Sequence, residues 1–151
     1  MKQDIKLIPV TGKDMKILWE WRNYPEVRKN FANSKPILWE EHELWFNQSI
    51  KNPNVKIYIA THKNSKIGVI RYNVDDKNVR VSVNLIPAFF GKGFGTILIK
   101  KGTKKFLRET KLIKPVIAQI KKDNVASQRA FANAGYKMAD SKENEVTYIY
   151  K

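Results

Sequence analysis

Residues 83–96 read VNLIPAFFGKGFGT, and this segment limits the possible folds of the chain more than any other. An alternating apolar stretch predicts a strand here, and three glycines at alternate positions predict a turn that opens a helix. Because glycine lacks a Cβ atom, the backbone N–H groups of such a turn are unshielded. With the positive end of the following helix, they suit a pyrophosphate. A plain strand–turn–helix corner would use the same residues, so this motif alone leaves both interpretations open.

A second motif follows at residues 119–136, which read QIKKDNVASQRAFANAGY. It predicts a helix over residues 124–134 that is closed by Gly135. Asn124 is well placed to cap that helix. A Rossmann arrangement does not fit, because the glycine turn comes after a meander of strands and has no βαβ unit around it.

The hydrophobic periodicity predicts one domain over residues 1–151, without repeats or linkers. Strands are expected at 4–10, 55–61, 66–74, 79–86, 115–120, 136–139 and 146–150. Helices are expected at 11–23, at 39–50, from the glycine turn to about Thr110 and at 124–134, with a short helical piece at Pro25. The fold class is therefore α+β, with a mixed, largely antiparallel sheet of about seven strands flanked by helices. In the helix after the glycines, Gly102 falls on the apolar ridge and would allow close approach to the sheet.

The two motifs, in this order and at this spacing, resemble the cofactor motifs of GNAT N-acetyltransferases, and the order of elements is similar to theirs. The resemblance implies acetyl-CoA as co-substrate, direct transfer of an acetyl group to an amine, and no metal. It implies that the pantetheine arm pairs with the strand before the glycines. Pro87 cannot donate a hydrogen bond, so regular pairing is expected to fail near it. The implied cofactor-binding residues are Val83, Leu85, Phe90, Gly91, Lys92, Gly93, Phe94, Gly95, Thr96, Asn124, Ser127 and Phe131.

Two positions depart from the family pattern. Phe90 stands where arginine or glutamine is usual, so the phosphate cradle is expected to be mainly backbone, with charge from nearby lysines. Phe131 stands where many relatives carry a tyrosine that protonates the departing thiolate, and phenylalanine cannot donate a proton. Tyr58, Tyr72 and Tyr136 are distant candidates for that proton, and each has an alternative role as an ordinary packed aromatic residue.

The N-terminal part, including LWEWRNYPEVR at 18–28 and EHELWF at 41–46, resembles one GNAT branch. That branch includes amino-sugar N-acetyltransferases of the pseudaminic-acid pathway and the ribosomal-protein alanine acetyltransferase-like group. The resemblance implies that this part builds the acceptor pocket, with Arg22, Asn23, Arg28 and Trp45 as candidate substrate-binding residues. Tryptophan suits a sugar face and arginine a diphosphate. Core packing and surface charge are their alternative roles.

His42 is the candidate general base, because Trp45 and Phe46 at i+3 and i+4 place it on an apolar helix face. Burial would keep its imidazole neutral, as a base requires. The alternatives are a packed structural histidine and proton transfer through water. His62 beside a turn is expected to be solvent-exposed, and Glu40, Glu41 and Glu43 are expected to form a solvated helix face.

The chain has a formal net charge of +15 and no cysteine. The charge suits a polyanionic partner, but the basic residues are spread along the chain without interleaved aromatics, so nucleic acid is not the favoured partner. The absence of cysteine excludes disulfides and a cysteinyl acyl-enzyme. No membrane span or signal peptide is seen, so the expected location is cytoplasmic, and a homodimer is allowed.

The expected acceptor is a small-molecule amine, foremost a nucleotide-linked amino sugar. The alternatives are the N-terminal amine of a ribosomal or other protein and an inactive module that binds CoA or nucleic acid.

Overall fold

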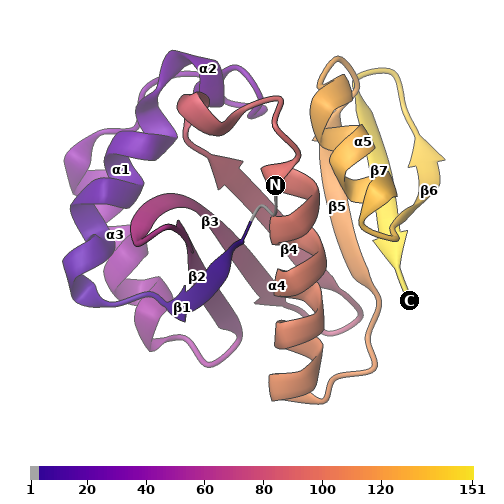
Figure 1. The fold of residues 1–151 in the computed structure, drawn as a ribbon, viewed down its shortest axis with the longest axis horizontal. Helices are drawn as coiled ribbons and strands as arrows, with labels where there is room; N and C mark the ends of the chain where they lie inside the picture. The colour runs from indigo at the N-terminus through magenta and orange to yellow at the C-terminus, as the bar shows by residue number, and fades with distance from the viewer. Residues whose placement is uncertain (1–3) are drawn as a thin grey trace.

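The computed structural model describes residues 4–151, which form a seven-stranded sheet with helices on both faces (Figure 1). The strands are β1 Lys6–Pro9, β2 Val55–His62, β3 Ser65–Val74, β4 Val79–Leu85, β5 Val116–Lys121, β6 Lys137–Ser141 and β7 Glu145–Tyr150. The α-helices are α1 Met15–Asn23, α2 Pro25–Arg28, α3 Trp39–Lys51, α4 Phe94–Thr110 and α5 Val125–Asn133. Single 3₁₀ turns cover Gly12–Asp14 and Pro87–Phe89. The predicted GNAT order of elements is confirmed. None of the helices in residues 4–151 is long and apolar enough to cross a membrane.

The strand order is β1-β2-β3-β4-β5-β7-β6, and every neighbouring pair is antiparallel except β4 and β5. That parallel pair has two register positions, Val79↔Val116 and Arg80↔Ile117. Val79 N donates to Pro115 O, whereas Ile86 N donates to Ile67 O on the other side. Because backbone groups alternate along a strand, the odd-numbered residues of β4 present their N–H and C=O groups toward β5. Beyond Arg80 the two strands separate, so the backbone groups of Val83 and Leu85 face an opening.

The sequence predicts that regular pairing fails near Pro87, but the opening between β4 and β5 begins well before that residue. Pairing of β4 with β3 continues through Leu85, and Pro87 starts the 3₁₀ turn after the strand. The separation from β5 begins earlier, after Arg80. Proline therefore ends the strand, and the divergence of β5 makes the gap.

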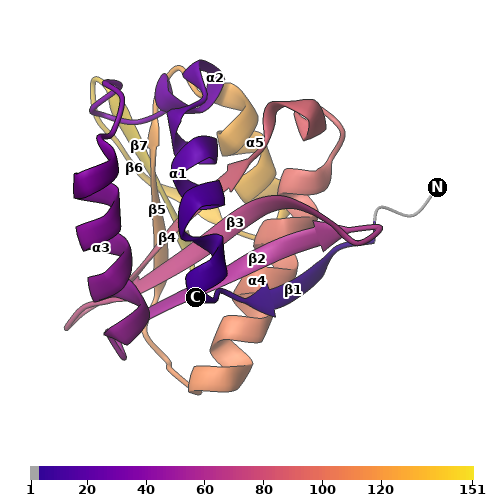
Figure 2. The ribbon, with the colours of Figure 1, turned by 90° about the vertical axis from the view of Figure 1, so that its left-hand side faces the viewer.

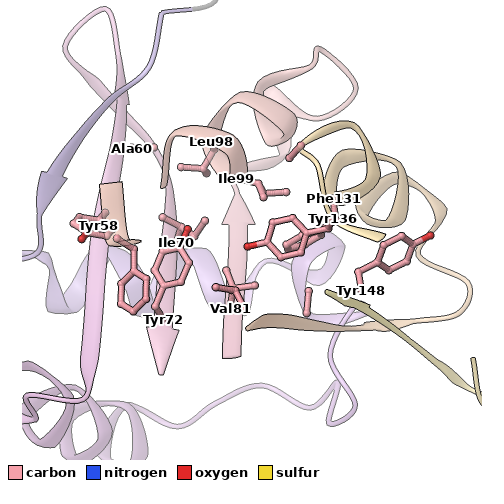
Figure 3. Close-up of a cluster of buried hydrophobic side chains, with 14 of the residues drawn as sticks. Tyr58, Ala60, Ile70, Tyr72, Val81, Leu98, Ile99, Phe131, Tyr136 and Tyr148 are labelled. Atoms are coloured by element: carbon pink, nitrogen blue, oxygen red, sulfur yellow. The ribbon is translucent and has the colours of Figure 1, made fainter. Parts of the chain in front are cut away.

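Helices α4 and α5 cover one face of the sheet and enclose the larger core. In Figure 3, Ile70, Tyr72 and Val81 of the strands point toward Leu98 and Ile99 of α4. Tyr72 stacks on Phe106 with ring centroids 4.5 Å apart and an interplanar angle of 12°. A Cβ atom at Gly102 would lie 2.8 Å from Tyr72 Oη and 3.1 Å from Ile70 Cδ1. The predicted close approach at Gly102 is confirmed.

Replacing Gly102 with leucine is expected to destabilise the fold by about 1–3 kcal/mol, because the new side chain overpacks the contact between α4 and β3. The better helix propensity of leucine offsets only part of this cost. Urea denaturation measures the change. The matched control is Lys104→Leu on the exposed side of the same helix, which should change stability by less than about 1 kcal/mol. Equal stability of the two variants would contradict the packing argument.

Helices α1 and α3 cover the opposite face over β2 to β4, so that the sheet lies between them and α4 in Figure 2. Leu18 and Trp21 of α1 and Phe46 of α3 pack there on Ile59. The helix predicted to start after Thr11 begins with the capping box formed by Thr11 and Asp14 and a 3₁₀ turn, before α1 itself. Beside this smaller core, Val69 and Arg71 of β3 and Ser82 and Asn84 of β4 border a cavity.

Candidate active site

A groove of about 990 Å³ runs along the opening between β4 and β5 and over the N-termini of α4 and α5. One part of its lining is formed by the edge of β4 and by the turn that contains Gly91, Gly93 and Gly95, which we call the glycine corner. Helix α5 forms another part. Ten of the twelve predicted cofactor residues line it: Val83, Leu85, Phe90, Gly91, Gly93, Gly95, Thr96, Asn124, Ser127 and Phe131. The structure therefore brings the two sequence motifs to one surface.

The glycine corner has the backbone conformation that its sequence demands. Gly91 and Gly93 have φ angles of 70° and 84°, a region that side chains with a Cβ disfavour. Gly93 is the N-cap of α4, and no side chain caps this helix end. The N–H groups of Gly95 and Thr96, in the first turn, have no intrahelical acceptor. These donors and the helix dipole fit a pyrophosphate without any help from a side chain at Phe90.

Lys92 and Phe94 lie outside the groove lining. The Phe94 side chain is buried and packs edge-on against His62 and Phe89, with centroids 4.8 and 5.2 Å apart. Only the backbone of Phe94 can therefore serve the corner. His62 is half-buried in this aromatic cluster and its Nδ1 lies 2.7 Å from Asp4 O, so the expectation of a solvent-exposed His62 is wrong. In the turn beside it, Lys63 and Asn64 are exposed, whereas His62 is only partly accessible.

On α5, Asn124 plays its structural role: its Oδ1 accepts from Ser127 N at 3.2 Å. Phe131 is buried and meets the edge of Tyr136 at 5.0 Å. The hydroxyl of Tyr136 is hydrogen-bonded to Thr103 Oγ1 at 2.7 Å, and Thr103 is bonded in turn to Tyr72 at 3.1 Å. Burial raises the pKa values of both tyrosines.

Tyr58 donates to Glu109 Oε1 at 2.6 Å, and burial, followed by Glu109, raises the pKa of Tyr58. Neither Tyr58, Tyr72 nor Tyr136 lines the groove. The three candidate proton donors therefore support the core. The hydroxyl groups that do line the groove belong to Ser82, Thr96 and Ser127.

A second cavity, of about 360 Å³, lies on the α1 and α3 side of the sheet. Its lining includes Trp21, Arg22, His42 and Trp45 from the helices. The cavity and the groove share four lining residues: Phe31, Arg71, Ser82 and Asn84. A thioester held along β4 would therefore reach the second cavity past the side chains of Ser82 and Asn84.

His42 is buried, and its Nε2 lies 2.7 Å from Met15 O. A carbonyl oxygen only accepts, so Nε2 carries the proton and Nδ1 keeps its lone pair in the neutral ring. Burial lowers the pKa of His42 below 6.5, and the bond to Met15 opposes this only in part. The predicted apolar setting of His42 is confirmed, and the ring is neutral at pH 7. Glu40, Glu41 and Glu43 are exposed, as expected, and Glu41 also borders the cavity.

Two arginines face the cavity, and sequence reasoning identified only one of them. The Cζ atom of Arg22 lies 3.4 Å from the centroid of the Phe31 ring. Arg71 reaches the cavity from β3, and its Cζ lies 5.0 Å from the centroid of Trp45. The available signal for Arg71 was a charged residue between Ile70 and Tyr72 in a central strand.

Asn23 and Arg28 lie outside the cavity and brace the loop that leads to α3. The Asn23 amide donates to Ile37 O at 3.0 Å and accepts from Ile37 N at 2.8 Å. Arg28 Nε donates to Asn23 O at 3.1 Å, and its Nη1 donates to Ser34 O at 3.3 Å. Of the four predicted substrate-binding residues, Arg22 and Trp45 line the cavity.

Comparisons with known proteins agree with this geometry. The profile of the acetyltransferase (GNAT) domain matches residues 4–137. Acetyltransferase PseH of Campylobacter jejuni is 28% identical over 116 residues, which cover 76% of this chain and 71% of PseH. An uncharacterized protein of Methanocaldococcus jannaschii, MJ1062, is 31% identical over 97% of this chain, which corresponds to 31% of its own length.

Solved structures show the same fold. A domain from Methanocaldococcus jannaschii superposes with a TM-score of 0.85 at 24% identity, covering 99% of each chain. Campylobacter jejuni PseH in complex with acetyl coenzyme A superposes with a TM-score of 0.73 at 18% identity, covering 98% of this chain and 99% of PseH. The family match spans most of the chain and includes both sequence motifs, residues 83–96 and 119–136. The chain therefore belongs to the acetyltransferase (GNAT) domain family, and it is an acetyl-CoA-dependent N-acetyltransferase.

Proposed function

We propose that this enzyme transfers the acetyl group to the primary amine of a nucleotide-linked amino sugar, as the branch that contains PseH suggests. The observation that carries the proposal is the junction of the groove and the second cavity at Ser82 and Asn84. It lets a donor on the α4 side of the sheet meet an acceptor on the α1 and α3 side. The aromatic walls of the cavity, formed by Trp21, Trp45 and Phe31, suit a sugar ring and a base.

In this proposal, different residues bind the donor, accept the amine proton and stabilise the leaving group. Acetyl-CoA supplies an activated acetyl thioester. The backbone of Val83 and Leu85 holds its pantetheine arm, and the amides of Gly95 and Thr96 hold its pyrophosphate. His42 accepts the amine proton at Nδ1, directly or through one water, while the C–N bond forms and the C–S bond breaks. Backbone N–H groups and hydroxyl groups that line the groove donate hydrogen bonds to the departing thiolate. Holding both reactants at this junction supplies much of the reduction in the barrier.

Other acceptors are alternatives to be tested, because solved structures of this fold include spermidine and aminoglycoside acetyltransferases. The decisive assay measures thiol release from acetyl-CoA with a UDP-linked amino sugar, the same amino sugar without the nucleotide, and an N-terminal peptide. We expect the nucleotide-linked sugar to have the highest kcat/KM. Preference for the peptide would overturn the proposed acceptor.

Thermal unfolding with and without acetyl-CoA is the companion measurement. Acetyl-CoA at 100 times its Kd should stabilise the protein by about 2.7 kcal/mol. Stabilisation without thiol release from any acceptor would instead indicate a scaffold that binds CoA without turnover. Stabilisation by an oligonucleotide alone, with steep salt dependence, would favour a nucleic-acid-binding module.

A further inference from the structure

Arg22 lines the second cavity, and one of its guanidinium nitrogens has no hydrogen-bond partner. Its guanidinium stacks on Phe31, and its Nη1 atom is buried without a hydrogen-bond partner. Buried donors in folded proteins are almost always paired, and an unpaired one is costly, more so on a charged group. Because Arg22 lines the cavity, an anion bound there lies next to a guanidinium whose donors are incompletely paired within the protein.

Arg71 brings a second positive charge to the same cavity. Its Nε donates to the neutral Asn73 Oδ1 at 2.9 Å, and its Cζ lies near the Trp45 ring. The ion pairs in residues 4–151 use the carboxylates of Asp14, Asp75 and Glu109, so neither Arg22 nor Arg71 has a carboxylate partner there. Glu41 is the acidic residue in the cavity lining, and its side chain is exposed on α3.

The two charges repel one another. Burial first, then the charge of Arg71, then that of Arg28, lower the pKa of Arg22 to about 10. Burial also lowers the pKa of Arg71. Arg22 still carries its charge at pH 7. Two like charges in a half-enclosed space favour a counter-anion, and the planar donor arrays of arginine suit the oxygens of phosphate.

We propose that Arg22 and Arg71 form a receptor for a phosphate or diphosphate group on the acceptor, and that the same pair discriminates against polycationic amines. The inference rests on the proposed function only in taking the second cavity as the acceptor site. It adds the chemical class that the cavity selects and the two residues that select it. Trp45 and Phe31, which contact these guanidiniums, hold them in place at the junction with the groove.

Isothermal titration with pyrophosphate, at fixed ionic strength and with saturating CoA, tests the receptor. The CoA blocks the glycine corner, so that pyrophosphate reports on the acceptor cavity alone. Wild-type protein should bind pyrophosphate, and Arg22→Met or Arg71→Met should weaken that binding at least about tenfold. The matched control, Arg108→Met, removes the same charge from the exposed surface of α4 and should change the Kd by less than about twofold.

Arg22→Lys and Arg71→Lys keep the charge but lose the planar donor array, so their affinities should lie between those of wild type and the methionine variants. CoA binding in each variant confirms that it is folded. Absence of pyrophosphate binding in the CoA-saturated wild type, or equal affinity in all variants, would overturn the receptor.

Turnover separates this inference from the proposed function. The receptor also predicts that spermidine is a poor acceptor for wild type and that Arg22→Met, Arg71→Met together improve its kcat/KM. Efficient spermidine acetylation by wild type contradicts the discrimination. If pyrophosphate binds through the two arginines but a nucleotide-linked amino sugar is not acetylated, the receptor stands and the proposed acceptor is wrong.

Discussion

Replacing Gly95 with glutamate is expected to weaken acetyl-CoA binding by at least about a hundredfold, or about 2.7 kcal/mol. Gly95 lies in the first turn of α4 and lines the groove. A carboxylate there would accept hydrogen bonds from the helix N-terminus and repel the pyrophosphate that needs the same donors. Isothermal titration with acetyl-CoA measures the loss.

The fold should tolerate this change. A Cβ atom at Gly95 would lie 3.6 Å from Ala130 Cβ and 3.8 Å from Leu85 Cδ1, which are ordinary contacts. Gly12→Glu is the matched control, because a Cβ atom at Gly12 meets nothing within 4 Å and Gly12 lies outside the groove. A folded Gly95→Glu protein with the acetyl-CoA affinity of wild type would show that the glycine corner is not the phosphate site.

The cofactor groove could be predicted from the sequence because its information is local. Positive φ angles at Gly91 and Gly93 and an uncapped helix start are properties of a few consecutive residues. The sequence predicts less well which side chains of this turn line the groove. The resemblance implied Lys92 and Phe94 together with their neighbours, yet the Phe94 side chain turns into the core. A family motif specifies the residues of the turn, whereas the direction of each side chain depends on how the turn packs against the rest of the fold.

The acceptor cavity could be predicted only in part, because it depends on residues that meet through the tertiary fold. Arg71 comes from β3, Trp45 from α3 and Arg22 from α1, and no sequence spacing links them. Asn23 and Arg28 were candidates because the stretch that they share with Arg22, residues 18–28, resembles one branch of the family. Their hydrogen bonds to the loop at Ile37 and Ser34 became visible only when that loop was placed. The opening between β4 and β5 likewise depends on the path of β5, which the alternation within β4 does not contain.

Replacing His42 with glutamine is expected to lower kcat/KM by about 10²–10⁴-fold if Nδ1 takes the amine proton. Glutamine is the informative choice because its amide can still donate to Met15 O, the bond that Nε2 makes in the wild type. The measurement is the pH dependence of kcat/KM. Wild-type activity should be lost as pH falls through the pKa of His42, which burial holds below 6.5, and the variant should lack this acid limb.

Folding stability provides an independent readout of the same imidazole. Because the folded-state pKa of His42 lies below the unfolded value of 6.5, the unfolded chain binds more protons between the two values. The contribution of His42 to stability is therefore complete above about pH 6.5 and decreases as pH falls to the folded-state pKa. Urea midpoints at pH 7.5 and 5.5 should differ more for wild type than for His42→Gln. The contrary outcome is a His42→Gln protein that loses this stability difference yet keeps the acid limb of kcat/KM. It would show that His42 is a packed structural residue. Another group at the cavity, such as Glu41, would then take the proton.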